Sequence, residues 1–183
     1  MFVATVLPLR PLCYDPTMPQ DIFDVVDERD QVIGQAPRAE VHARRLMHRA
    51  VHVFLFNSRG EFLLQMRSVH KDEHPLTYTS SCSGHVDSGE TYDEAAVREL
   101  GEELGLDCEL EPLQKFAATP ELAMEHTMLY RAVSDDTPVI DEHEIDFVQF
   151  HPLDEVRQML AAQPQIFSPP LRVLVGWYSQ NIN

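Results

Sequence analysis

Apolar segments separated by polar turns predict several β-strands in this chain. Two largely apolar runs, Val51–Phe56 and Phe62–Arg67, flank the polar turn Asn57–Gly60, which is the pattern of a β-hairpin. A shorter hairpin with a polar turn at Glu28–Asp30 is expected within Ile22–Arg38. Three later apolar segments predict further strands, at Leu113–Ala118, His126–Val133 and Phe147–Phe150.

Helix signals lie between and after these strands. Thr91 and Glu94 have the spacing of a capping box, and Gly105 suits the position just past a helix end, so a helix is expected from Tyr92 to Leu104. Two later segments are also expected to be helical, Leu153–Ala162 and Pro169–Tyr178. Polar loops are expected at Ser68–Pro75 and Asp135–Glu144. This mixture of elements predicts an α/β fold with a mixed sheet covered on both faces.

The helix expected at 92–104 places its carboxylates and its apolar side chains on different faces. At about 100° per residue, Glu99, Glu102 and Glu103 fall within one arc. Arg98 flanks this arc, where it can pair with Glu102 or Glu94. The adjoining arc is expected to face a core, and it consists of Ala96, Val97, Leu100 and Leu104.

Carboxylates packed this densely repel one another, by roughly 0.2–0.5 kcal/mol for each like-charged pair one helical turn apart. A hard divalent cation among them would turn that repulsion into coordination, and Mg²⁺ prefers a few carboxylates together with waters and substrate phosphates. Gly84 and Gly89 precede the helix and allow the backbone to approach a ligand closely. The segment therefore predicts a metal-assisted phosphate site, and the alternative is a solvated acidic helix face.

The 23 residues from Gly84 resemble the Nudix box, G-x5-E-x7-R-E-U-x-E-E-x-G-U, in which U is a bulky aliphatic residue. Every specified position is filled, by Gly84, Glu90, Arg98, Glu99, Leu100, Glu102, Glu103, Gly105 and Leu106. The resemblance implies an α/β/α sandwich, bound Mg²⁺ or Mn²⁺, and hydrolysis of a nucleoside diphosphate linked to another group.

Roles for individual residues follow from the same resemblance. It implies that Glu99, Glu102 and Glu103 are metal ligands and that one of these glutamates also serves as a base, for which Glu99 and Glu103 are the candidates. It further implies that Gly84 lends its carbonyl oxygen to the metal and that Arg98 orients a glutamate.

Segments outside the box resemble type 1 isopentenyl-diphosphate isomerases and the Nudix hydrolases most similar to them, through FNSRGEFLLQMRSVHK, YTSSCSGHVDSGE and FSPPLRVL. Those isomerases bind a metal with three histidines and two glutamates. The resemblance implies a second metal site with Glu125 as its carboxylate and three imidazoles, those of His42, His48 and His85. It also implies that Arg67 and Lys71 hold the diphosphate.

This chain departs from the isomerase pattern at four places. Ser83 occupies the position of the catalytic cysteine, and Cys82, one residue earlier on a strand, would point to the opposite face. Ala123 occupies the position of one metal-binding glutamate, the spacing from His42 to His48 is one residue short, and the box is complete where the isomerases tend to have a degraded one.

Together the departures favour hydrolysis. An isomerase-like enzyme acting on a prenyl diphosphate is the alternative, and a non-catalytic nucleotide-binding module is a third. A base for the attacking water is also expected downstream of the box, and Glu125 is favoured over the other carboxylates there, Glu121, Glu142 and Glu144.

Charge limits the classes of partner. The chain has 14 Lys and Arg residues against 30 Asp and Glu residues, so its net charge is −16 with neutral histidines. Such a chain repels the nucleic-acid backbone, and it would repel a phosphate substrate unless metal ions screened the site. We therefore expect a small-molecule diphosphate as the partner and no nucleic acid, although acidic solubility alone explains the charge equally well.

Length and composition set the remaining expectations. No apolar run approaches the roughly 20 residues needed to span a membrane, and three cysteines without paired spacing indicate reduced thiols and a cytoplasmic location. We expect a single domain at residues 21–183, for which a homodimer is compatible with the resemblance. Residues 1–20 are interrupted by prolines and are expected to form an extended or disordered arm, with Met18 as an alternative start to Met1.

Overall fold

A mixed β-sheet lies at the centre of the computed structural model, which describes residues 21–182. The arm expected at 1–20 and the alternative start at Met18 lie outside the described residues. The five strands of the main path lie in the order β5 (Tyr78–Thr79), β4 (Glu61–Arg67), β3 (His48–Phe56), β8 (Glu125–Val133) and β7 (Leu110–Phe116). Two more strands join them, β6 (Cys82–His85) beside β3 and β9 (Ile145–Pro152) beside β4.

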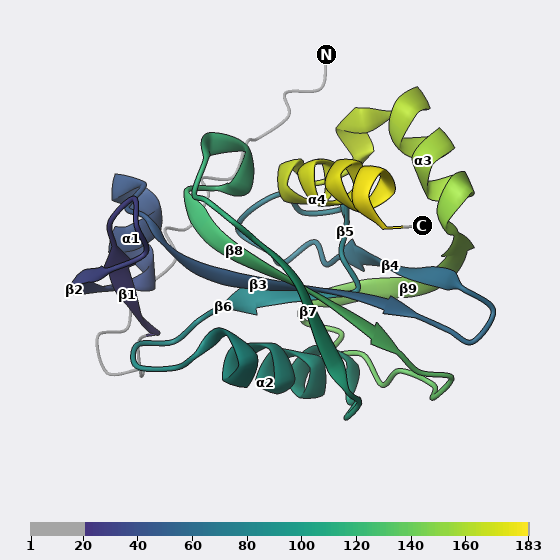
Figure 1. Ribbon diagram of the computed structural model, residues 1–183, viewed down its shortest axis with the longest axis horizontal. Coiled ribbons are helices and arrows are strands. Elements are labelled where there is room, and N and C mark those ends of the chain that lie inside the picture. The colour runs from purple at the N-terminus through teal and green to yellow at the C-terminus, as the bar shows by residue number, and fades with distance from the viewer. Residues whose placement is uncertain (1–20, 183) are drawn as a thin grey trace, which may run out of the picture.

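Helices cover both faces of this sheet (Figure 1). One face packs against α2 (Tyr92–Leu104), and the other packs against α4 (Pro169–Asn181), near which α3 (Leu153–Ala162) lies. At one end lie α1 (Arg38–Arg44) and a hairpin of β1 (Ile22–Val26) and β2 (Val32–Pro37). Two 3₁₀ turns complete the elements, η1 (Pro120–Leu122) and η2 (Pro164–Ile166). The expected α/β/α sandwich with a mixed sheet is therefore confirmed.

Strand β3 provides side chains to both cores because successive residues of a strand point to opposite faces. Its Val51, Val53 and Leu55 pack against α2, whereas Phe54 and Phe56 pack against α4. Strands β3 and β8 run parallel, from His48 beside Glu125 to Phe56 beside Val133. The start of β3 and the start of β8 consequently lie side by side, and both carry residues expected at the site.

A fork in the sheet opens along β3. The strand pairs with β6 from Ala50 to Val53, but it meets β4 only where Phe56 lies opposite Phe62. Between these points Ser81 bridges the two strands, because its Oγ accepts from the Leu55 N–H at 2.8 Å and donates to the Leu63 carbonyl at 2.6 Å. A serine hydroxyl thus satisfies buried backbone groups that the diverging strands leave unpaired.

The expected orientation of α2 is wrong in one respect. Val97 was expected in the core, yet it is 55% exposed, while Ala95 and Glu103 are buried with Leu100 and Leu104. The helix is therefore rotated about its axis so that the acidic arc, rather than Val97, turns toward the sheet. This rotation brings Glu103 beneath β6.

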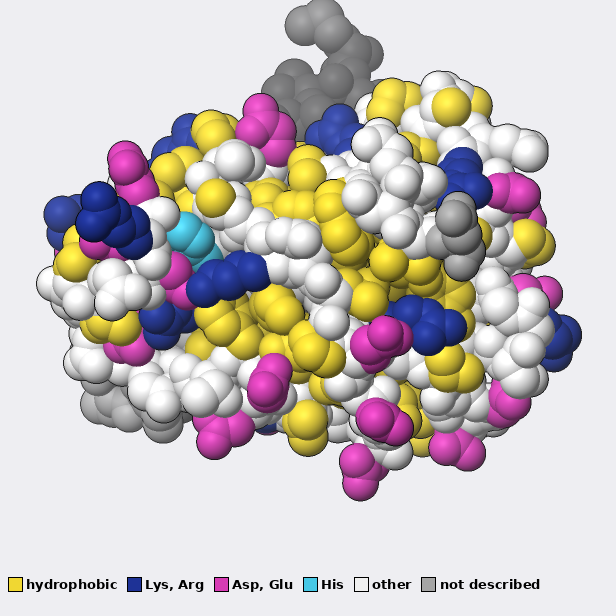
Figure 2. Space-filling view, in the orientation of Figure 1, with side chains coloured by type: hydrophobic (Ala, Val, Ile, Leu, Met, Phe, Trp, Pro, Cys, Tyr) yellow, Lys and Arg dark blue, Asp and Glu magenta, His cyan; other side chains and the backbone are white. Residues whose placement is uncertain are grey.

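Surface charge and helix length both bear on the expected partners. Acidic and basic side chains are interspersed over the face shown in Figure 2, and the basic ones form no continuous stripe of the kind that binds nucleic acid. Within residues 21–182, no helix has the length and apolar character required to cross a bilayer.

The cap of α2 supports a stability prediction. Thr91 accepts from the Glu94 N–H at 3.3 Å, and the Glu94 carboxylate accepts from the Thr91 N–H at 2.9 Å, which is the expected capping box. We expect Thr91→Ala to lower the free energy of unfolding by roughly 0.5–2 kcal/mol. Chemical denaturation measures the change, and Thr137→Ala, at an exposed loop threonine, should leave it within about 0.5 kcal/mol. Equal stability of the two variants would contradict the role of the cap.

Candidate metal and phosphate site

A cavity of about 590 Å³ lies where β3, β4 and β6 diverge, between α2 and the loop that follows β4. Many of the residues predicted from the sequence line it, namely Arg67, Lys71, Gly84, His85, Arg98, Glu99, Glu102, Glu103 and Glu125. A neighbouring cavity of about 320 Å³ is lined by His42 and His48, and the two cavities share Glu73, His74 and Ala123. A volume of this order suits a small ligand.

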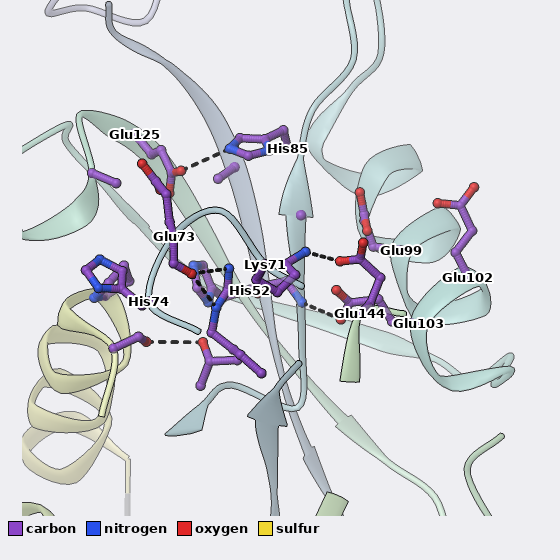
Figure 3. A pocket seen from close by; sticks show the side chains of 18 of the residues that line it. His52, Lys71, Glu73, His74, His85, Glu99, Glu102, Glu103, Glu125 and Glu144 are labelled. Atoms are coloured by element: carbon purple, nitrogen blue, oxygen red, sulfur yellow. Dashed lines mark hydrogen bonds and ion pairs between the residues drawn. The ribbon is translucent and has the colours of Figure 1, made fainter. Parts of the chain in front are cut away.

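The three glutamates of α2 differ in their surroundings. Glu103 is only 4% exposed, and its Oε2 accepts from the Ser83 N–H of β6 at 3.1 Å. The side chain of Glu99 is largely buried, whereas that of Glu102 is 63% exposed. Figure 3 shows Glu99 and Glu103 on the cavity side of α2, with Glu102 farther out. The predicted ligand set therefore consists of two buried carboxylates and one at the rim.

Burial makes the two inner carboxylates unfavourable as free anions. It raises the pKa of Glu103 to about 7, with a further contribution from the charge of Glu99. Burial also raises the pKa of Glu99, against the effect of the Arg98 guanidinium. A divalent cation would reverse both effects, because it supplies positive charge where the carboxylates have lost water. The donor set thus fits Mg²⁺ or Mn²⁺, both of which prefer oxygen ligands.

Arg98 holds the acidic residues together. Its Nε and Nη2 each donate to Glu90 at 2.9 Å, and Nη2 also donates to the His85 carbonyl at 2.9 Å. Its Nη1 donates to Glu99 at 2.7 Å and to Glu102 at 3.1 Å. The role predicted for Arg98 fits this geometry, and the pairing with Glu102 occurs. The alternative pairing with Glu94 does not, because the Glu94 carboxylate is held by the helix cap.

Gly84 lies directly against the carboxyl group of Glu99. A Cβ atom at this position would overlap the Glu99 carboxyl carbon and both of its oxygens. The absence of a side chain at Gly84 therefore makes room for the carboxylate itself, which the sequence analysis did not foresee. That the Gly84 carbonyl binds a metal stays a prediction.

The two basic residues expected to hold phosphate lie on and beside the loop after β4. Nε and Nη2 of Arg67 donate to the Glu73 carbonyl at 3.0 and 2.9 Å, which leaves Nη1 without a described partner among residues 21–182. Lys71 pairs with Glu144 across the cavity (Figure 3). Burial lowers the pKa of both Arg67 and Lys71. An anionic group entering the cavity would stabilise their charged forms.

Among the downstream carboxylates, only some reach the cavity. Glu125 and Glu144 line it, and Glu144 is engaged by Lys71. Glu121 and Glu142 are exposed and lie outside it. Glu125, the favoured base, faces imidazoles instead of open space, with its Oε1 at 3.2 Å from Nε2 of His85 and 3.6 Å from Nε2 of His48.

Three elements bring the predicted histidines together. His42 lies on α1, His48 begins β3 and His85 ends β6, and one ligand atom from each lies within 4.8 Å of the others. His48 is 1% exposed. Burial lowers the pKa of His85 to about 4, and the charge of Glu125 opposes this effect. Burial raises the pKa of Glu125, but the nearby rings of His48 and His85 outweigh this effect and hold that pKa below its usual range.

Hydrogen bonds assign the tautomers of two of these rings. Nδ1 of His48 lies 2.9 Å from the Leu46 carbonyl, and Nδ1 of His42 lies 3.3 Å from Oε1 of Glu73. Because both partners can only accept, each Nδ1 carries the proton, and Nε2 of the neutral ring keeps a lone pair. Both Nε2 atoms are buried and lack a hydrogen-bond partner within the described part of the chain. Lone pairs that converge beside a carboxylate fit a cation, and imidazoles favour Zn²⁺, Mn²⁺ or Fe over Mg²⁺.

Sequence reasoning missed several residues that line the cavity, among them His52 and Glu73. His52 is buried, and its Nδ1 lies 2.6 Å from Oγ of Ser80, which donates to the Cys82 carbonyl. The signal was present, since His52 follows His48 by four residues on one strand and therefore shares its face. Glu73 gave no such signal, because it lies in a loop without a regular pattern.

Ser83, at the position of the isomerases' catalytic cysteine, and Cys82, one residue earlier, point to opposite faces of the strand, as expected. Cys82 is fully buried in the core beside α2, whereas Ser83 lines the cavity. The group presented to a ligand at this point is thus a hydroxyl.

Comparison with known proteins gives consistent results. A family model described as NUDIX domain matches residues 46–170. Isopentenyl-diphosphate Delta-isomerase 2 of Photorhabdus laumondii is 31% identical over 168 residues, which cover 89% of this chain and 91% of that protein. An uncharacterized Nudix hydrolase of Nostoc is 48% identical over 88 residues, 48% of this chain and 52% of the relative. The crystal structure of DR0079 from Deinococcus radiodurans has 31% sequence identity and a TM-score of 0.78, covering 86% of this chain and 98% of that one.

Burial of Glu103 generates a prediction about pH. In the metal-free folded protein, Glu103 stays protonated up to about pH 7, whereas in the unfolded chain it loses its proton near pH 4.5. The free energy of unfolding therefore falls as the pH rises from 4.5 to 7. Glu103→Gln removes the charge, and we expect it to be more stable than the unmodified protein at pH 8 by roughly 1–3 kcal/mol. Unfolding with a chelator present at pH 8 and at pH 4.5 measures the difference, which should nearly vanish at the lower pH. A less stable variant at pH 8 would contradict the argument.

Close packing of Gly84 generates a second prediction. In Gly84→Ala the new methyl group must displace the Glu99 carboxylate, so we expect Mg²⁺, which the imidazole cluster does not favour, to bind roughly 10-fold more weakly by calorimetry. Gly101→Ala is the matched control, because a Cβ at Gly101 meets nothing within 4 Å and alanine favours the helix. Equal Mg²⁺ affinity in the two variants would contradict the role of Glu99 as a ligand.

Proposed function

This chain belongs to the Nudix family, and from that membership and the two buried carboxylates of α2 we propose that it is a divalent-metal-dependent enzyme that hydrolyses a diphosphate bond. The proposed substrate is a nucleoside diphosphate linked to another group. The observation that carries the proposal is the position of Glu99 and Glu103, which are buried together beside a cavity at the cost of raised pKa values. Such an arrangement is unfavourable in a helix with only a structural role and favourable in one that binds a cation.

Within this proposal, Glu99, Glu102 and Glu103 would hold Mg²⁺ or Mn²⁺. The bound ion would neutralise charge on the diphosphate and assist the attack of water. Arg98 keeps two of the ligands in place through its contacts with Glu99 and Glu102. Arg67 is the nearby side chain that can add a contact to a phosphate oxygen, through the Nη1 that its Glu73 contact leaves available.

Binding an anion in so acidic a chain requires positive charge at the site. Lys71 contributes such a charge from the loop, and its pairing with Glu144 keeps it near the α2 carboxylates. A diphosphate that entered with a metal ion would compete with Glu144 for this ammonium group. Lys71 would then steady the leaving phosphate as a point charge.

The proton of the attacking water would pass to a carboxylate of α2, for which Glu99 and Glu103 are placed at the cavity wall. We assign Glu125 to the histidine cluster instead, because its Oε1 already lies close to the rings of His48 and His85. This cluster is proposed as a second metal site of His42, His48, His85 and Glu125. The unpartnered Nε2 atoms of two of its rings support that assignment.

One observation favours a second candidate function. Similarity to an isopentenyl-diphosphate isomerase extends over 89% of this chain, so an isomerase-like reaction on a prenyl diphosphate is the alternative. Against it, Ser83 lines the cavity, and the thiol of the adjacent Cys82 is buried in the core beside α2. Incorporation of deuterium from solvent into a prenyl diphosphate, without release of phosphate, would identify the isomerase. Binding without any turnover would identify a non-catalytic module.

The proposed hydrolysis is tested with matched glutamates. We expect Glu102→Gln to lower kcat roughly 10²–10³-fold, because one ligand for the charge-neutralising ion is lost. Glu109→Gln alters another exposed carboxylate and should leave kcat unchanged. The measurement is release of phosphate-containing products from nucleoside diphosphate sugars, dinucleotides, nucleoside triphosphates and prenyl diphosphates, with Mg²⁺ or Mn²⁺. A Glu102→Gln variant with normal metal-dependent turnover would overturn the assignment of this ligand.

A further inference from the structure

Glu73 lies at a junction between the histidine cluster and the substrate loop at residues 68–77. Its Oε1 lies 3.3 Å from Nδ1 of His42, and its backbone carbonyl accepts the two hydrogen bonds from Arg67. Figure 3 shows the carboxyl group of Glu73 directed toward Glu125. One residue therefore contacts both a predicted metal ligand and a predicted phosphate-binding side chain.

We propose that Glu73 is a positioning residue that fixes His42 for a metal ion and thereby couples occupation of the histidine site to the conformation of loop 68–77. The proposal rests on the histidine site proposed above, and it does not depend on which reaction the enzyme catalyses. Its occupant is a borderline divalent cation such as Mn²⁺, Zn²⁺ or Co²⁺, because the site offers imidazole nitrogens.

The first argument concerns how each ring is fixed. Metal-binding histidines commonly donate their second ring N–H to a carbonyl or carboxylate, which sets both the tautomer and the orientation of the ring. His48 uses the backbone carbonyl of Leu46 for this purpose, two residues away on its own segment. His42 uses the side chain of Glu73, which is 31 residues away. The orientation of His42 therefore depends on where the loop places Glu73.

The second argument concerns charge. Glu73 and Glu125 contact different rings of the same cluster, since Oε1 of Glu73 lies 3.3 Å from Nδ1 of His42 and Oε1 of Glu125 lies 3.2 Å from Nε2 of His85. Two like charges therefore lie beside one group of rings. A cation bound by the Nε2 atoms would attract both carboxylates, one as a ligand and the other through His42. Binding of the metal would then strengthen the contact that holds Glu73.

The third argument concerns the loop itself. One part is held on the acidic side, where Ser68 N–H donates to the Glu144 carbonyl at 3.0 Å and Lys71 pairs with the Glu144 carboxylate. The other part is held on the histidine side by Glu73. Directly after it, His74 and Leu76 have φ values of 48° and 56°, which L-residues rarely adopt. Contacts at both sides therefore help to set the path of the loop. Loss of the Glu73 carboxylate should loosen its histidine side, while the backbone contact of Glu73 with Arg67 remains.

The experiment uses Co²⁺ as the probe, with the full-length protein in millimolar Mg²⁺ so that the carboxylate site is occupied. Co²⁺ binding to imidazoles is followed by its visible absorption, and His48→Ala establishes which signal belongs to the histidine site. Because the Glu73 side chain is 46% exposed, its replacement should not disturb the core. We expect Glu73→Ala to weaken Co²⁺ binding roughly 10–100-fold and Glu73→Gln, which can still accept from Nδ1, to weaken it less.

Asp72→Ala is the matched control, because Asp72 is an exposed carboxylate of the same loop. It should bind Co²⁺ as the unmodified protein does. Hydrogen exchange provides a second readout, since Co²⁺ should protect residues 68–77 in the unmodified protein and in Asp72→Ala but not in Glu73→Ala.

Two results would overturn the proposal, and they have different meanings. Unchanged Co²⁺ affinity and loop protection in Glu73→Ala would reject the role of Glu73 while leaving the histidine site intact. Absence of any signal that depends on His48 would reject the histidine site and the coupling together. Neither result bears on hydrolysis at the α2 carboxylates, which the Glu102→Gln assay decides separately.

Discussion

The guanidinium group of Arg98 is the contact on which the rest of the site depends. It joins the loop before α2 through Glu90, the end of β6 through the His85 carbonyl, and α2 itself through Glu99 and Glu102. Without a cation at this point, the carboxylates of α2 would repel one another, and the contact that Arg98 makes with the end of β6 would be lost. The pKa of Arg98 is raised, first by its hydrogen bond with Glu90 and further by Glu99, so the positive charge is permanent. Since His85 also belongs to the histidine cluster, the same group fixes the relative position of both candidate metal sites.

Local signals were sufficient for much of the fold. The bounds of α2 follow from its capping box and Gly105, and α3 begins directly after Pro152; the structure has both helices where they were expected. Strand β6 could not be predicted in the same way, because the sequence CSGH has neither alternation nor bulk, and its extended form depends on pairing with β3. The seven-residue helix α1 likewise has only one buried residue, Val41, to provide a pattern. The rotation that exposes Val97 also depends on tertiary contacts, since it is set by how Glu103 meets the strand.

In the candidate site too, some residues could be predicted from short sequence segments, whereas others depend on tertiary contacts. A resemblance carried by short segments was enough to name His42, His48 and His85, and the fold brings their ligand atoms together. It also named Glu125 as the carboxylate of this cluster, and the strand register puts Glu125 beside His48 while Glu121 lies outside the main cavity. Glu73 could not be predicted from the sequence, because its contacts with His42 and Arg67 depend on the path of a loop that has no periodic pattern.

The fork beside β3 has a consequence for how such a protein can diverge. The carboxylates proposed to hold the ion at the phosphate site lie on α2, whereas another part of the cavity wall comes from the loops at 68–77 and 134–144. The Ser81 bridge completes the hydrogen bonding of the fork from within the sheet, so those loops are not needed to close the gap between the strands. After a gene duplication, mutations could therefore accumulate at loop positions other than Lys71, Glu73 and Glu144 and alter which molecule is accepted, while the inherited carboxylates of α2 stayed unchanged. Selection would act on substrate choice and on catalysis as two nearly separate traits.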